Sequence, residues 1–80
     1  MIKKYDDNYI DLSKVDAVTS IRYKVTRDRI NGHDFYCFLL FMNGETLLFK
    51  DENKQRLSAL RERLIKDWME VRDDESRFQR

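Results

Sequence analysis

The feature that most constrains the fold is an unbroken run of eight apolar or aromatic residues, FYCFLLFM at positions 35–42, in a chain of 80 residues. In a β-strand, successive side chains point to opposite faces of the sheet. A strand made from this run therefore places apolar groups on both faces. Either two layers cover this strand or one apolar face stays exposed.

An Asn43-Gly44 pair directly follows the run. Asn-Gly between apolar segments is typical of a two-residue type I′ hairpin turn, because both central residues of that turn need positive φ. The pair predicts a hairpin between strands 34–42 and 45–50. Its register places Met42 opposite Glu45, Leu40 opposite Leu47, and Phe38 opposite Phe49.

A second pair, Asn31-Gly32, predicts another hairpin on the other side of the run. Pairing outward from that turn places Val25 opposite Phe38, Tyr23 opposite Leu40, and Ile21 opposite Met42. Both turns direct apolar partners to the same face, and a slip of one residue would reverse this. We therefore predict a three-stranded meander, 19–28, 34–42 and 45–50. Its core face is formed by Ile21, Tyr23, Val25, Tyr36, Phe38, Leu40, Met42, Leu47 and Phe49.

The last third of the chain has the apolar spacing of a helix. Leu57, Leu60, Leu64 and Trp68 recur every three or four residues, and Asp51 is a candidate N-cap. We expect a helix over 52–72, which closes a single domain of residues 1–72, and a frayed charged tail over 73–80. At the other end, 2–5 and 9–12 are candidate short strands around a polar turn, followed by one helical turn begun by Ser13.

The order of elements resembles that of small FlbD-type flagellar proteins and of many short phage or prophage proteins. The landmarks are YIDLSKVDAV at 9–18 and NGETLLFKD at 43–51, and the resemblance spans residues 1–70. This chain differs in its long arm at 27–34 and its aromatic-rich third strand. The resemblance implies a small regulatory or inhibitory protein and transfers no site residues.

These elements predict an α+β fold: an antiparallel sheet of three to five strands with one long C-terminal helix packed on one face. A helix is about 10–12 Å wide and covers two or three strands of one face only. The second face carries an apolar strip, which we define as Leu39, Phe41 and Leu48. It also carries a basic rim, which we define as Arg22, Lys24 and Lys50.

Burial of each large side chain of the strip stabilises by about 1.5–3 kcal/mol. Three covers remain open: the N-terminal segment of the same chain, a second copy of the chain, or a different partner. Contiguous exposed apolar patches mark interaction surfaces.

The sequence contains no catalytic or metal-binding signature. His33 is the single histidine and Cys37 the single cysteine, so a structural zinc site is excluded. His33 fits a turn residue and Cys37 a small packing residue. We expect no catalytic residue, no cofactor and no metal.

Basic residues are concentrated in one predicted hairpin: Arg22, Lys24, Arg27 and Arg29. A basic sheet face with interleaved aromatics binds single-stranded nucleic acid in some modules. However, 16 basic and 15 acidic residues give a net charge of only +1. The alternative interpretation is a solvated edge whose charges discourage sheet-to-sheet aggregation.

The functional expectation is therefore a non-catalytic protein-binding module, phage-encoded and acting as a regulator or inhibitor of a host factor. The contact residues would be Leu39, Phe41 and Leu48, with Arg22, Lys24 and Lys50 around them. We expect a homodimer or small homo-oligomer, formed through this face or an exposed strand edge. The alternatives are nucleic-acid binding through the basic hairpin and an oligomer that sequesters a small anionic ligand.

The expected location is the cytosol. A single cysteine and the lack of a recognisable signal peptide fit a reducing compartment. No apolar run approaches the roughly 20 residues that a membrane span needs.

Overall fold

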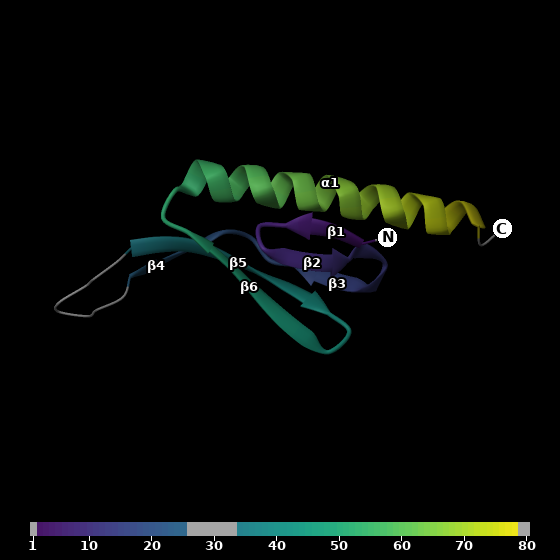
Figure 1. The fold of residues 1–80 in the computed structure, drawn as a ribbon, viewed down its shortest axis with the longest axis horizontal. Coiled ribbons are helices and arrows are strands. Elements are labelled where there is room, and N and C mark those ends of the chain that lie inside the picture. Colours follow the sequence, from purple (N-terminus) through teal and green to yellow (C-terminus); the bar gives the residue numbers. More distant parts are fainter. Residues whose placement is uncertain (1, 26–33, 79–80) are drawn as a thin grey trace.

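The structure, a computed structural model, describes residues 2–25 and 34–78, and side-chain surroundings within these ranges up to residue 73. The fold is α+β, with antiparallel strands on one side of one long helix, as expected (Figure 1). In chain order the elements are β1 (Ile2–Tyr5), β2 (Asn8–Asp11), a 3-10 helix (Leu12–Lys14), β3 (Val15–Val18), β4 (Arg22–Val25), β5 (Asp34–Met42), β6 (Glu45–Asp51) and α1 (Lys54–Phe78).

Strand β5 lies at the centre of the main sheet. β6 pairs along one edge of β5, while β3 and β4 follow one another along the opposite edge. Thr19 spans the break between them: its N–H donates to the Leu39 carbonyl (2.9 Å), and its Oγ1 accepts from the Leu39 N–H (2.8 Å). β3 and β4 therefore act as one interrupted strand beside β5.

The Asn43-Gly44 hairpin is confirmed. Asn43 has φ 49° and Gly44 has φ 81°, as a type I′ turn requires. The predicted pairs of Met42 with Glu45, Leu40 with Leu47, and Phe38 with Phe49 are all present. The register of β5 and β6 is therefore the one predicted from the Asn43-Gly44 turn.

The register predicted for the other hairpin is wrong. Tyr23 pairs with Tyr36 instead of Leu40, and Val25 pairs with Asp34 instead of Phe38. The physical reason is that β3 occupies the positions beside Leu40–Met42, which displaces β4 toward the start of β5. The displacement is an even number of residues, so each side chain keeps its predicted face. The Asn31-Gly32 turn lies outside the described residues.

The N-cap of α1 is Asn53, and the prediction of Asp51 is wrong. Asn53 Oδ1 accepts a hydrogen bond from the Arg56 N–H at 3.1 Å, which is the geometry of an N-cap. Asp51 accepts from the Asn53 N–H at 2.8 Å and binds the Arg56 guanidinium through two bonds of 2.6 and 2.9 Å. Asp51 therefore fixes the loop before the helix. The helical backbone continues to Phe78, beyond the expected end at residue 72.

The N-terminal segment forms the expected hairpin, β1–β2, closed by Asp6 in the left-handed region at φ 57°. The helical turn that follows begins at Leu12, where the Asp11 carboxylate accepts from the N–H and O–H of Ser13 (3.1 and 2.6 Å). The expected single helical turn is therefore present, one residue earlier than predicted, but the strand after it begins at Val15 and not at residue 19, because Val15–Val18 pairs with β5. β-branched valines fit a strand better than a helix.

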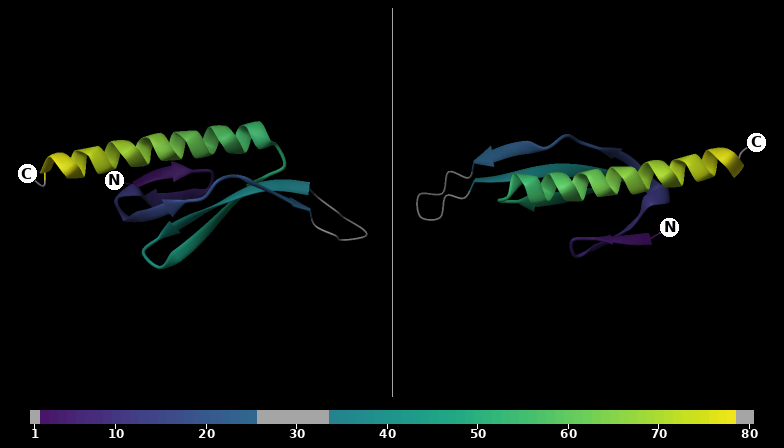
Figure 2. Two further views of the ribbon diagram at one scale, coloured as in Figure 1. Left: turned by 180° about the vertical axis from the view of Figure 1, so that it is seen from behind. Right: turned by 90° about the horizontal axis from the view of Figure 1, so that it is seen from above.

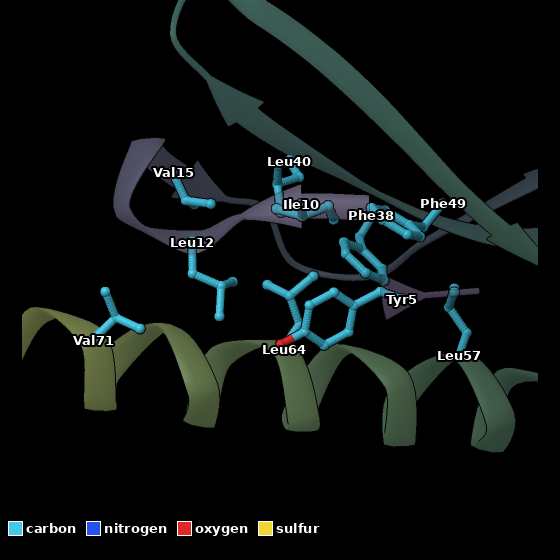
Figure 3. Close-up of a cluster of buried hydrophobic side chains, with 10 residues drawn as sticks. All are labelled: Tyr5, Ile10, Leu12, Val15, Phe38, Leu40, Phe49, Leu57, Leu64 and Val71. Atoms are coloured by element: carbon cyan, nitrogen blue, oxygen red, sulfur yellow. The ribbon is translucent and has the colours of Figure 1, made fainter. Parts of the chain in front are cut away.

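The core lies between the main sheet on one side and α1 with the β1–β2 hairpin on the other (Figures 2 and 3). Phe38 and Phe49 stack at its centre, with ring centroids 5.0 Å apart. Figure 3 labels the buried side chains, which come from both layers: Tyr5, Ile10, Leu12, Val15, Phe38, Leu40, Phe49, Leu57, Leu64 and Val71.

Two residues predicted for the core face are exposed. Tyr23 and Val25 lie on β4, which extends past the first turn of α1 (Figure 1). The helix therefore cannot cover them. The Tyr23 hydroxyl donates a hydrogen bond to the Asp34 carboxylate, and its ring packs against Tyr36 with centroids 5.2 Å apart.

Candidate protein-binding surface

The apolar strip forms one contiguous group on the second face of the main sheet. Leu39 and Leu48 are directly paired across β5 and β6, and Phe41 lies two residues along from Leu39 on the same face. Phe41 is 37% exposed and Leu48 is 53% exposed, while Leu39 is half-buried. Ala17 of β3 pairs with Phe41 and extends the group across a third strand.

The N-terminal segment does not cover this strip. Its buried residues Tyr5, Ile10 and Leu12 pack in the core cluster, together with Leu57 and Leu64 of α1. The hairpin therefore lies on the same side of the sheet as the helix (Figure 3). The N-terminal segment is therefore not the cover of the strip. A second copy of the chain and a different partner remain as alternatives.

The basic rim lies at the other end of the same face. Arg22 of β4 and Lys50 of β6 pair with Cys37 from opposite sides, and both are exposed, as is Lys24. Lys50 Nζ lies 5.8 Å from the centre of the Phe35 ring. The strip therefore lies at the end of this face near the β5–β6 turn, and the rim lies at the opposite end, near the start of β5.

The described strands direct their carboxylates away from this face. Glu45 and Asp51 alternate to the opposite face from Leu48, and Asp34 shares the face of Tyr36. Asp16 stands at the bulge in β3, where its carboxylate accepts from the Asn43 N–H at 3.1 Å. The surface consequently combines the apolar groups of the strip with the three basic residues of the rim.

Sequence reasoning missed the exposure of Ile2 and Tyr9, which are 67% and 72% exposed. Both lie on the outer face of the β1–β2 hairpin, opposite to the buried Tyr5 and Ile10. The alternation of residues around Tyr5 and Ile10 was the available signal. Tyr9 is separate from the strip and lies under the Lys4 ammonium, 5.8 Å from its ring centre.

A hollow of about 680 Å³ lies between the first half of α1, the β1–β2 turn and the end of β6. Its charged lining includes Asp6, Lys50, Arg56 and Arg63. Arg56 is already bound by Asp51, and that ion pair lowers the pKa of Asp51 to about 2. The hollow thus has charges of both signs, and two of them, Asp51 and Arg56, are paired with each other.

Only some of the chemical groups named from the sequence lie among the described residues. No set of three or more His, Cys, Asp or Glu residues in the described parts of the chain could hold a metal ion. Cys37 is a buried free thiol. Of the basic hairpin, Arg22 and Lys24 are placed, whereas Arg27, Arg29 and His33 lie outside the described residues.

Within residues 2–25 and 34–78, no helix has the length and apolar character to cross a membrane. Comparisons with protein-family models, curated proteins and solved structures found no match. The resemblance to FlbD-type and phage proteins stays a prediction.

Proposed function

We propose that this protein is a non-catalytic protein-binding module, acting in the cytosol as a regulator or inhibitor. Its contact surface is the apolar strip, Leu39, Phe41 and Leu48, with the basic rim of Arg22, Lys24 and Lys50. The observation that carries the proposal is the exposure of Phe41 and Leu48 on a face that no described segment covers. The layout's resemblance to short phage proteins supports a host protein as the target.

The chemistry of the surface specifies the chemistry of the partner. Apolar side chains of the partner would cover the strip, and carboxylates beside them would face the rim. Charged groups around such a contact mainly set the association rate and its salt dependence, while the central apolar contacts set the dissociation rate. A stable contact needs about 800 Å² from each side, so it must extend beyond the strip to the rim and to Ala17.

The test is capture of a partner from an extract of the native host on immobilised protein, with matched variants. The strip variant carries Phe41→Glu and Leu48→Glu, and the control carries Ile2→Glu and Tyr9→Glu, which replaces two exposed apolar residues elsewhere. We expect the strip variant alone to lose a band that wild type and control retain. A rim variant, Arg22→Glu with Lys50→Glu, should weaken capture most at low salt.

A band retained by the strip variant, or lost equally from the strip and control variants, would contradict the proposal. Urea unfolding of each variant shows whether the substitutions leave the fold intact. All four substituted apolar side chains of the two variants are exposed, so we expect similar unfolding midpoints.

Nucleic-acid binding is the second candidate. It is favoured by Arg22 and Lys24, which share a sheet face with the aromatic residues Phe35 and Phe41. Phosphate contacts would make the affinity for a mixed-sequence oligonucleotide fall steeply with salt. A titration at two salt concentrations distinguishes nucleic-acid binding from protein binding, because absence of oligonucleotide binding at low salt excludes the nucleic-acid candidate. A small anionic ligand held between subunits would instead appear as additional mass in native mass spectrometry.

A further inference from the structure

The outer edge of β6 presents unpaired backbone groups. Among the described strands, β6 pairs with β5 only (Figure 1). Leu39 directs its N–H and carbonyl to Thr19, away from its cross-strand partner Leu48. The two residues therefore form a non-hydrogen-bonded pair, and Leu48 directs its own N–H and carbonyl away from β5. By the alternation of antiparallel ladders, Thr46 and Lys50 do the same.

We propose that β6 of a second copy of this chain pairs antiparallel with this edge, around a two-fold axis at Leu48. Leu48 is the middle residue of Glu45–Asp51. An axis there pairs every residue of β6 with one from the second copy. Each hydrogen-bonded pair of an antiparallel ladder exchanges two bonds, so Thr46, Leu48 and Lys50 would form about six backbone bonds.

The side chains in this register are compatible. On the second face, Leu48 meets Leu48 of the second copy, and Thr46 lies opposite Lys50. On the core face, Leu47 lies opposite Phe49 and Glu45 opposite Asp51. The Asp51 carboxylate is already bound by Arg56 at 2.6 and 2.9 Å, so Glu45 approaches an ion pair and not a free carboxylate. A shift by two residues keeps the faces but leaves residues at both ends unpaired.

The edge also lacks the usual protection against pairing. Natural edge strands are blocked by prolines, bulges or charges along the strand. β6 contains no proline, its pairs with β5 are continuous, and its three charged residues, Glu45, Lys50 and Asp51, stand at its ends. Pairing would place the apolar strips of two copies side by side, with Leu48 of each at the junction. The pairing itself uses backbone groups and is independent of the proposed function.

The first test is the mass of the protein in solution by sedimentation velocity over a range of concentrations. We expect wild type to reach twice the 9.8 kDa of one chain. Thr46→Pro removes one outward N–H and leaves the bonds to β5 in place, a position where edge strands tolerate proline. This variant should be monomeric, with the circular dichroism spectrum of wild type.

The second test addresses the register. Thr46→Lys places a lysine opposite Lys50 of the second copy, and like charges directly opposite destabilise strand pairing. We expect the dimer to dissociate at least about tenfold more readily. The double variant Thr46→Lys with Lys50→Glu places opposite charges there and should restore the wild-type dimer.

Three results would overturn the proposal: a monomeric wild type at every concentration, a dimer that survives Thr46→Pro, or a double variant as weakly associated as Thr46→Lys. A dimer lost on Phe41→Glu but kept in Thr46→Pro would show packing face to face. If monomeric Thr46→Pro still captures the host partner, the proposed function holds without the edge pairing. If wild type dimerises but captures no partner, only the proposed function fails.

Discussion

Phe38→Ala is expected to lower the free energy of unfolding by about 3–5 kcal/mol, whereas Phe41→Ala is expected to lower it by about 1 kcal/mol or less. Both residues belong to β5. Phe38 is 1% exposed and stacks on Phe49 at 5.0 Å, so its truncation leaves a cavity between two layers. Phe41 points to the other face, where truncation leaves no enclosed space.

The measurement is urea unfolding followed by circular dichroism, with both variants compared at one protein concentration. A small domain is stable by only about 5–15 kcal/mol, so we expect Phe38→Ala to leave little folded protein at 37 °C. Leu40→Ala serves as a second core variant, because Leu40 is fully buried on the same face. Equal losses for Phe38→Ala and Phe41→Ala would mean that both faces are covered.

Tyr5→Ala is expected to lower the free energy of unfolding by about 3–5 kcal/mol, as for other large buried aromatic residues. Tyr5→Phe is expected to lower it by about 1.5–3 kcal/mol. The Tyr5 ring is 1% exposed, and its hydroxyl donates to Asp67 of α1 at 2.6 Å. Lys3 Nζ lies 3.4 Å from the same carboxylate. The hydrogen bond between Tyr5 and Asp67 joins β1 to the helix. Tyr5→Phe removes only this bond, whereas Tyr5→Ala also removes the packing of the ring.

The same pair predicts a pH dependence. The Tyr5 hydrogen bond, followed by the Lys3 contact, lowers the pKa of Asp67 below its usual value near 3.8, against the opposing effect of burial. A lowered pKa in the folded state contributes stability above the unfolded-state pKa, and this is lost as the pH falls through the folded-state pKa. Burial and the Asp67 bond raise the pKa of Tyr5, so the phenol remains the donor at neutral pH.

Stability curves between pH 2 and 7 should therefore be flatter below about pH 4 for Tyr5→Phe than for wild type. Asp67→Asn should flatten the curve in the same range and serves as the control. If Tyr5→Phe and wild type lose stability in parallel on acidification, the hydrogen bond does not carry the linkage.

The parts of the fold that the sequence predicts are those with strong local signals. Asn43-Gly44 determines the β5–β6 register, and the leucine spacing predicts α1. The register of β4 depends on the position of β3, which the sequence did not predict because the spacing of Leu12, Val15 and Val18 also fits a helix. The prediction of the N-cap of α1 was also wrong. Asp51 and Asn53 are both suitable N-cap residues, and only the contacts of Arg56 with each of them show which one caps the helix.

The sequence predicts which residues form the candidate surface, but it does not predict whether these residues are exposed. Alternation along β5 and β6 assigns Leu39, Phe41 and Leu48 to one face. Whether they stay exposed depends on where β1–β2 packs, and that is decided by tertiary contacts such as Tyr5 with Asp67. No local pattern in residues 2–11 specifies which side of the sheet the hairpin covers.

The proposed function requires that the apolar strip on the second face of the sheet is open to solvent in the isolated protein. Line broadening of methyl signals by a soluble paramagnetic agent measures this directly by NMR. We predict strong broadening for the Leu48 methyls and little for those of Leu40 and Leu64, which are fully buried. Leu48 methyls as protected as those of Leu40 would contradict the claim.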